Sequence, residues 1–258
     1  MTTQFTKAYT IPTYDCDLAD RLKISALFNY FQDSCETFAN HDGFGCQALK
    51  PKGLTWMIHD YDIRVNTLPH RHDNIVVDMH IDRMHHFRGL FIFNIHDKDR
   101  HVQLAESACQ YLLVNPIEMK MADIKENLPN IPVQKEDKIV FERLPDVSTE
   151  KTPDTIRRIS YEHIDFNQHV NNSYYPVFAQ ESLPRSLFEG YDIQRIRVSY
   201  KSPATLHERI AVYSDIPDKM ALHSQTISTH HKITYATDKR TELARIQFDW
   251  MRANREHT

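Results

Sequence analysis

The feature of this sequence that most constrains its fold is an internal repeat of one helix pattern followed by several strand patterns. In the first half, the i, i+3, i+4, i+7 spacing of an amphipathic helix begins at Ile24 and continues to about Phe38. Strand-like alternation of apolar and polar residues follows, over 75–81, 91–95 and 104–114. The second half repeats this order, with a helix pattern over 171–188 and strand patterns over 193–200, 210–213 and 244–250. The repeat predicts an α+β protein of two similar domains, each with a long helix and an antiparallel sheet.

Individual residues support a duplication. Ile63-Arg64-Val65-Asn66 with Pro69 matches Ile196-Arg197-Val198-Ser199 with Pro203, Leu104-Ala105 matches Leu243-Ala244, and Asp17 matches Asp165. The spacing between the matches predicts about fifteen extra residues after the first helix, within 41–53. Prolines among charged residues near 128–153 predict a first domain over 1–128, a linker over 129–153 and a second domain over 154–258.

Composition excludes several functional classes. Only 5 of the 258 residues are glycine, and none belongs to the glycine-rich motifs that bind dinucleotides or nucleoside triphosphates. The net charge of -4 and the lack of a basic run argue against a nucleic-acid partner. No apolar run approaches the ~20 residues that cross a bilayer, and residues 1–10 lack a signal-peptide core. We therefore expect a cytoplasmic protein without membrane contact.

Cysteine and histidine spacing gives no support for a disulfide framework or a metal site. Cys16, Cys35, Cys46 and Cys109 are irregularly spaced. The histidine pairs have no neighbouring ligands to complete a zinc site. We predict reduced thiols, no metal and no cofactor.

The densest polar cluster is the run Asp-Phe-Asn-Gln-His-Val-Asn-Asn at 165–172, placed between a predicted strand ending near Ile164 and the second helix. Carboxylate, amide and imidazole groups at Asp165, Asn167 and His169 can converge on one cleft beside the unpaired backbone N–H groups of a helix start. Such N–H groups can stabilise the oxyanion that forms on an attacked carbonyl.

The same run also permits a purely structural interpretation. Asn171 or Asn172 can cap the helix, and Asp165 can form an Asx-turn. From the residues alone, both interpretations remain open.

The run D-F-N-Q-H-V-N-N-S-Y-Y, with Glu181 on the same predicted helix, resembles the signature of the acyl-acyl carrier protein (ACP) thioesterases. The likeness covers nearly the whole chain, including Tyr14-Asp15-Cys16-Asp17, Trp56, Arg83 and Phe87. It implies two tandem hotdog domains that hydrolyse the thioester between a fatty acyl chain and the phosphopantetheine of ACP, releasing free fatty acid in fatty acid biosynthesis. Shorter motifs with H-V-N-N occur in single-hotdog acyl-coenzyme A thioesterases. An acyl-coenzyme A thioesterase and a non-catalytic acyl-binding module are therefore the alternatives.

The resemblance also implies roles for individual residues. Asp165 orients the site or acts as general base, Asn167 holds the carbonyl or the water, and His169 shares proton transfer. Which of Asp165 and His169 takes the proton is left open. Glu181 is a weaker catalytic candidate, and Trp56, Asn171 and Tyr174 are weaker candidates for substrate contact. The implied partner is ACP, water is the only co-reactant, and a homodimer is a further expectation.

Two departures from the family bear on the chemistry. Plant members carry a Glu-Cys pair where this chain has Pro203 and Ala204, and no cysteine follows Cys109. This favours attack by water over a Cys-linked acyl-enzyme. In the first copy, Ala19 and Arg21 stand where Asn167 and His169 stand in the second, which predicts one active site per chain.

The first copy is then left to shape the acyl tunnel. Its candidate lining residues are Phe28, Phe31 and 56–58, which would equally serve as ordinary core. Arg195, Arg197 and Lys201 share one strand face, which is either a surface for an acidic carrier or simply solvated.

Overall fold

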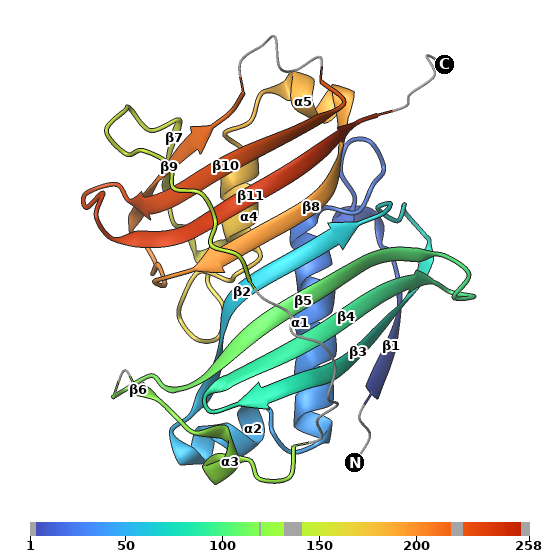
Figure 1. Cartoon of the computed structure of the whole chain (residues 1–258), viewed down its shortest axis with the longest axis vertical. Coiled ribbons are helices and arrows are strands. Elements are labelled where there is room, and N and C mark those ends of the chain that lie inside the picture. Colours follow the sequence, from blue (N-terminus) through green and yellow to red (C-terminus); the bar gives the residue numbers. More distant parts are fainter. Residues whose placement is uncertain (1–3, 119, 132–140, 218–223, 254–258) are drawn as a thin grey trace. The chain divides into compact units, whose positions relative to one another are not determined.

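The computed structural model describes residues 4–118, 120–131, 141–217 and 224–253 (Figure 1). The chain divides into two compact units, Met1–Phe141 and Glu142–Thr258. The first unit contains strands β1 (Gln4–Thr10), β2 (Thr55–Val65), β3 (Asn74–His85), β4 (Arg88–Asp97), β5 (Gln103–Asn115) and β6 (Lys120–Met121), and helices α1 (Ile24–His41), α2 (Cys46–Leu49) and α3 (Ile124–Asn127). The second contains strands β7 (Thr155–Arg158), β8 (Tyr191–Tyr200), β9 (Arg209–Asp215), β10 (Thr226–Tyr235) and β11 (Glu242–Arg252), and helices α4 (Tyr174–Gln180) and α5 (Arg185–Gly190).

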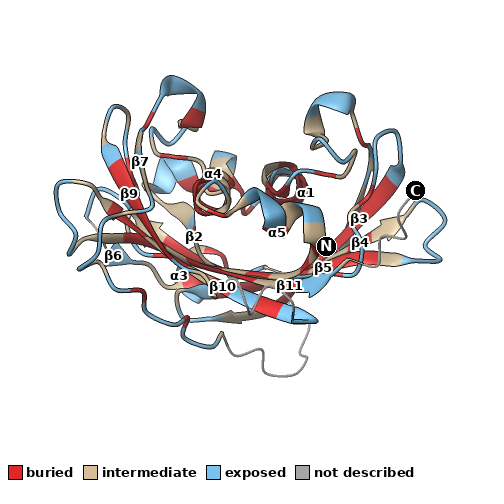
Figure 2. Cartoon of the chain, turned by 90° about the horizontal axis from the view of Figure 1, so that it is seen from above, coloured by how far each residue is buried: buried red, intermediate tan, exposed pale blue. Residues whose placement is uncertain are grey.

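Each unit has one antiparallel sheet, and the two sheets have the same strand order. The order is β1-β3-β4-β5-β2 in the first unit, with β6 paired to β5, and β7-β9-β10-β11-β8 in the second. Equivalent strands of the two units also follow one another along the chain in the same order. The main helices, α1 and α4, both come after the first strand of their unit. In each unit the main helix packs on one face of its own sheet (Figure 2). The α+β class and the duplication are confirmed.

The core of the first unit follows from the predicted helix stripe. Phe28 and Phe31 on α1 are fully buried. The ring of Phe28 lies 4.9 Å from that of Tyr61 on β2, and the ring of Phe31 lies 5.1 Å from that of Phe93 on β4. The helix ends where Gly43 adopts a left-handed conformation, with φ of 80°, which glycine reaches without a steric penalty.

The second unit departs from prediction at its helix and at the strand before the motif. The single helix predicted over 171–188 is two short helices, because Pro184 has no N–H to donate and disfavours a helical conformation at Leu183. The strand predicted to end near Ile164 ends at Arg158 instead. A capping box at Ser160 starts a 3-10 helix, Tyr161–His163, which replaces the end of that strand.

Matching hydrogen bonds fix the register of the repeat. The Leu22 N–H donates to the Pro69 carbonyl at 2.8 Å, as the Val170 N–H donates to the Ala204 carbonyl at 2.9 Å. Positions before the helix are therefore related by 148 (170 minus 22), and positions on the following strand by 135 (204 minus 69). The strand offset of 133 to 134 inferred from Ile63 and Ile196 is wrong. A slip of two residues leaves every side chain on the same face, so alternation alone does not detect it.

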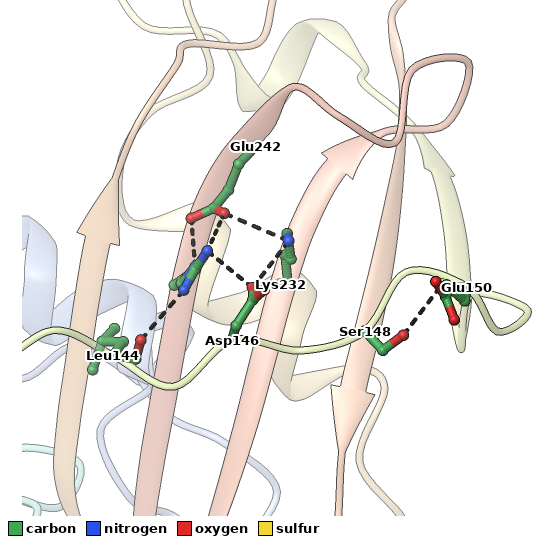
Figure 3. Close-up of polar contacts among 7 residues, drawn as sticks. Leu144, Asp146, Ser148, Glu150, Lys232 and Glu242 are labelled. Carbon is green, nitrogen blue, oxygen red and sulfur yellow. Dashed lines mark hydrogen bonds and ion pairs between the residues drawn. The ribbon is translucent and has the colours of Figure 1, made fainter.

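The segment that leads into the second unit packs across the strands of that unit (Figure 3). The Asp146 carboxylate lies 3.0 Å from Lys232 Nζ and 2.9 Å from Arg245 Nη2. Glu242 binds the same two cations, and the Leu144 carbonyl accepts a hydrogen bond from Arg245 at 3.3 Å. This part of the predicted linker is attached to the second unit, whereas 132–140 lies outside the described residues.

The basic strand face predicted at Arg195, Arg197 and Lys201 is not open at Arg197. Its side chain is 14% exposed and contacts the Glu142 carboxylate at 3.1 Å. It also donates to Gln247 at 2.6 Å. An acidic residue of the chain itself therefore contacts part of the surface suggested for an acidic carrier. Among the described residues, no helix is long and apolar enough to cross a membrane.

Candidate active site

The three main catalytic candidates, Asp165, Asn167 and His169, lie in the motif loop (165–172), between the Tyr161–His163 turn and α4. The Asp165 N–H donates to the His169 carbonyl at 2.8 Å, and the Gln168 N–H donates to the Asp165 carbonyl at 3.0 Å. Asp165 Oδ1 accepts a hydrogen bond from the Asn167 N–H at 2.8 Å. Gln168 takes a left-handed φ of 66°. The Asx-turn is therefore present, and it holds Asp165, Asn167 and His169 within one tight turn.

The functional groups of this loop remain available. Within the part of the chain that the structure describes, the side chains of Asn167 and His169 make no hydrogen bond, and neither does Asp165 Oδ2. Asn167 is exposed, while Asp165 and His169 are half-buried. A carboxylate oxygen, an amide and an imidazole are thus free to bind water or substrate.

The counterpart loop of the first copy (17–24) has the same backbone but different chemistry. The Asp17 N–H donates to the Arg21 carbonyl at 2.7 Å, and Asp17 Oδ1 accepts from the Ala19 N–H at 2.8 Å. Asp20 has a φ of 62°, as Gln168 does in the second copy. Here, however, the Arg21 guanidinium lies 3.2 Å from Asp17 Oδ2. The ion pair uses the oxygen that stays unused in Asp165, which supports the prediction of a single site.

Asn171 forms an Asx-turn just before α4, whose N-cap residue is Ser173 and has no side-chain cap. Its Oδ1 accepts a hydrogen bond from the Ser173 N–H at 2.9 Å, and its carbonyl accepts one from the Tyr174 N–H at 3.0 Å. Tyr174 begins α4, and its ring lies 4.9 Å from that of His163. A substrate contact by Asn171 or Tyr174 stays a prediction.

His163 is a buried residue of this region that the sequence interpretation missed. Its Nδ1 accepts a hydrogen bond from the Ser160 N–H at 3.1 Å. Burial, together with the nearby Arg157 charge, lowers the pKa of His163 below its usual value, which favours a neutral ring. The spacing Ser160-x-x-His163 is that of a capping box with His in the place of Glu or Gln, which is the signal that was available in the sequence.

Glu181 contacts a cation outside the motif loop. Its carboxylate forms a short ion pair with Arg157 of β7, and the Arg157 guanidinium lies 5.2 Å from the Phe178 ring centre. Among the described residues, no hydrogen bond joins Glu181 to Asp165, Asn167 or His169. The structure thus places Glu181 as a satisfied helix carboxylate, and its catalytic role stays a prediction.

Trp56 is part of the packing of the first unit. Its indole N–H donates to the Phe44 carbonyl at 2.9 Å, and its ring lies 6.1 Å from Phe91 and 6.4 Å from Tyr111. Core packing accounts for these contacts, and a role in binding the acyl chain stays a prediction.

The four thiols are poorly suited to nucleophilic attack. All lie in the first unit and are free. Burial raises the pKa of Cys35 to about 12 and that of Cys109 well above its usual value. Burial, followed by the Glu36 charge, raises the pKa of Cys46 to about 11, and burial also raises that of Cys16. Thiols with raised pKa values stay protonated near neutral pH, and the thiolate is the reactive form.

Two solved structures share the fold of this chain. An acyl-ACP thioesterase from Bacteroides thetaiotaomicron superposes with a TM-score of 0.82 over 96% of this chain and 98% of that chain, at 16% sequence identity. The 12:0-ACP thioesterase from Umbellularia californica superposes with a TM-score of 0.79 over 97% and 95% of the two chains, at 18% identity. These likenesses confirm the tandem hotdog fold.

Curated relatives match at the level of sequence. A chloroplastic dodecanoyl-ACP hydrolase from Cinnamomum camphora is 21% identical over 78% of this chain and 56% of its own length. A chloroplastic palmitoyl-ACP thioesterase from Gossypium hirsutum is 20% identical over 95% of this chain and 63% of its own length. This chain therefore spans somewhat more than half the length of these relatives.

Family models match both units. The acyl-ACP thioesterase N-terminal domain matches residues 2–131, and the C-terminal domain of the same family matches residues 148–251. The second match contains the motif loop, and the first contains its counterpart with Asp17 and Arg21. This chain belongs to the acyl-ACP thioesterase family.

Proposed function

We propose that this chain hydrolyses the thioester of acyl-ACP and releases free fatty acid, in the setting of fatty acid biosynthesis. The observation that carries the proposal is the motif loop, in which Asp165, Asn167 and His169 leave a carboxylate oxygen, an amide and an imidazole unpaired in one turn. Water adds to the thioester carbonyl, the C–S bond breaks, and the phosphopantetheine thiolate leaves and takes up a proton. The products are a fatty acid and the free thiol of the carrier.

Each group of the loop has a part in this reaction. Asp165 Oδ1 is held by the Asn167 N–H, while Oδ2 is free to accept a hydrogen bond from the attacking water or from the His169 ring. The Asn167 amide is free to donate to the carbonyl oxygen, where negative charge develops. Proton removal from water falls to either Asp165 or His169, and proton return to the leaving sulfur falls to the same pair.

Direct attack by water agrees with the thiol chemistry of the chain. The positions that match the plant Glu-Cys pair are Pro203 and Ala204, and Ala204 is completely buried. Every cysteine lies in the first unit, and each has a raised pKa. We therefore propose that no covalent acyl-cysteine forms during turnover.

The test is release of free fatty acid by the purified chain, measured with acyl-ACP and acyl-coenzyme A substrates of the same chain lengths. We expect release from acyl-ACP with a higher kcat/KM than from acyl-coenzyme A. Preference for acyl-coenzyme A would support the first alternative instead. Binding of acyl chains without release from either carrier would support the acyl-binding module.

Matched variants connect the activity to the motif loop. We expect His169→Ala to abolish release while circular dichroism shows an unchanged fold. Arg21 holds the position of His169 in the first copy, so Arg21→Ala is the control, with release close to that of the unmodified chain. Equal losses in the two variants would contradict the assignment.

A further inference from the structure

Three tyrosine hydroxyls bind the backbone where the motif loop is anchored. The Tyr175 hydroxyl on α4 accepts a hydrogen bond from the Ala204 N–H at 3.0 Å. The Tyr200 hydroxyl donates to the Asn172 carbonyl at 2.9 Å, and the Tyr235 hydroxyl donates to the Pro203 carbonyl at 2.8 Å. Asn172 is the last residue of the loop, and 203–204 lies in the connection between β8 and β9, where the Ala204 carbonyl binds the other side of the loop.

The contact at Tyr175 leads directly to the candidate catalytic residues. The Ala204 carbonyl accepts a hydrogen bond from the Val170 N–H at 2.9 Å, and Val170 follows His169. The His169 carbonyl in turn accepts from the Asp165 N–H. The Tyr175 hydroxyl is therefore connected to both ends of the Asp165–His169 turn through Ala204 and Val170.

The first copy provides an internal comparison, because it has the same loop backbone without Asn167 and His169. At the offsets of 148 and 135, Leu27 corresponds to Tyr175, Pro69 to Ala204 and Val65 to Tyr200. Pro69 has no N–H, so no acceptor is needed beside it, and Leu27 and Val65 are buried apolar residues. The same loop backbone is thus compatible with apolar side chains at these positions. In the copy that carries the candidate catalytic groups, the described residues have tyrosine hydroxyls there instead.

The Tyr175 side chain is almost completely buried, with 2% of its surface exposed. Burial raises the pKa of Tyr175 above its usual value, and the hydrogen bond from the Ala204 N–H offsets only part of that rise. The phenol therefore stays protonated near neutral pH. Because burying a hydroxyl and an N–H is favourable only when they are paired, loss of this hydroxyl leaves a buried donor unsatisfied.

We propose that Tyr175 is a positioning residue of the hydrolytic site, whose hydroxyl fixes the Asp165–His169 turn through Ala204 and Val170. The proposal rests on the proposed function, because it needs a reaction at that turn. In this proposal Tyr175 does not contact the substrate. Tyr175 instead fixes the position of groups that must approach the thioester carbonyl to within hydrogen-bonding distance.

The test compares two buried tyrosines of the second unit. Tyr175→Phe removes the acceptor of the Ala204 N–H. Tyr191→Phe is the control, because the Tyr191 hydroxyl also binds a backbone group, the Ser224 carbonyl at 2.8 Å, away from the motif loop. We expect kcat to fall about tenfold in Tyr175→Phe, with KM within twofold of the unmodified chain. In Tyr191→Phe we expect kcat to stay unchanged.

Hydrogen exchange supplies a readout that needs no activity. We expect faster exchange of the Ala204 and Val170 amides in Tyr175→Phe but not in Tyr191→Phe. Unchanged exchange at both amides, or faster exchange with an unchanged kcat, would overturn the proposal. Equal losses of kcat in the two variants would show that Tyr175 contributes only to general stability, and would also overturn the proposal. An unmodified chain that releases no fatty acid, but shows the exchange response, would refute the proposed function instead.

Discussion

The buried imidazole of His231 makes the second unit sensitive to acid. His231 lies on β10 and is 1% exposed. Its Nδ1 lies 2.8 Å from Ser214 Oγ, its Nε2 lies 3.0 Å from Thr229 Oγ1, and the Trp250 indole N–H donates to that same threonine oxygen at 3.2 Å. Burial, with smaller effects of the His230 and Lys151 charges, lowers the pKa of His231 to about 3.

The sign and size of the effect follow from proton linkage. An unfolded chain protonates this histidine near its reference pKa of about 6.5, whereas the folded chain protonates it only near pH 3. The stability contributed by the neutral ring is therefore present above pH 6.5 and is lost progressively as the pH falls below it. Each pH unit in this window is worth about 1.4 kcal/mol, so the free energy of unfolding drops by about 2 kcal/mol between pH 8 and pH 5.

The assay is urea unfolding at pH 8 and pH 5, followed by Trp250 fluorescence in a Trp56→Phe background. His231→Gln keeps a hydrogen-bonding side chain that does not titrate. We expect the pH-dependent loss of unfolding free energy to be smaller in His231→Gln by about 2 kcal/mol. An equal loss in both proteins would refute the argument that the buried ring is neutral.

Two further predictions concern the loop tips and the connecting segment. Phe166 is 76% exposed beside Asn167, and Leu18 is 98% exposed at the same place in the first copy. In steady-state kinetics we expect Phe166→Ala to raise the KM for acyl-ACP severalfold and Leu18→Ala to leave it unchanged. The reverse result would contradict a substrate contact at Phe166. Asp146→Asn removes the carboxylate between Lys232 and Arg245. Because Asp146 is exposed, we expect urea unfolding to show a loss of about 0.5 kcal/mol in the free energy of unfolding, and this loss should disappear in 1 M salt. A loss that persists in salt would indicate a packing effect instead.

The elements with strong periodicity were predictable from the sequence. The spacing from Ile24 through Phe31 gave the first helix, and apolar alternation identified β3, β4 and β5. Strand β10 was missed because two of its buried positions are Thr229 and His231, which form a polar network instead of an apolar stripe.

Other errors have equally specific causes. The register of the repeat slipped by two residues because a two-residue shift keeps the pattern of a strand intact. Pro184 indicated a break in the second helix, but the prediction followed the helical spacing of the apolar residues on both sides of it. The ion pairs of Asp146 join residues about 90 positions apart in the chain, 146 and 232, and no local pattern predicts such contacts.

The candidate site was predictable as a loop but not as a geometry. The motif named Asp165, Asn167 and His169, and the structure places them in one turn. The pairing of Glu181 with Arg157 and the contact of Tyr175 with Ala204 depend on tertiary packing, whereas the capping role of His163 had a local signal in its spacing from Ser160. The cytoplasmic location and the homodimer stay predictions.

Of the two copies of the shared loop, we expect only the second to perform hydrolysis. Asp165→Asn and Asp17→Asn test this expectation most directly, because asparagine keeps the oxygen that accepts the hydrogen bond at position 167 or 19 and removes only the negative charge. The measurement is the rate of free fatty acid release from acyl-ACP by each variant. We expect a loss of at least about 100-fold in Asp165→Asn and a rate close to that of the unmodified chain in Asp17→Asn. An undiminished rate in Asp165→Asn, or equal losses in both variants, would contradict it.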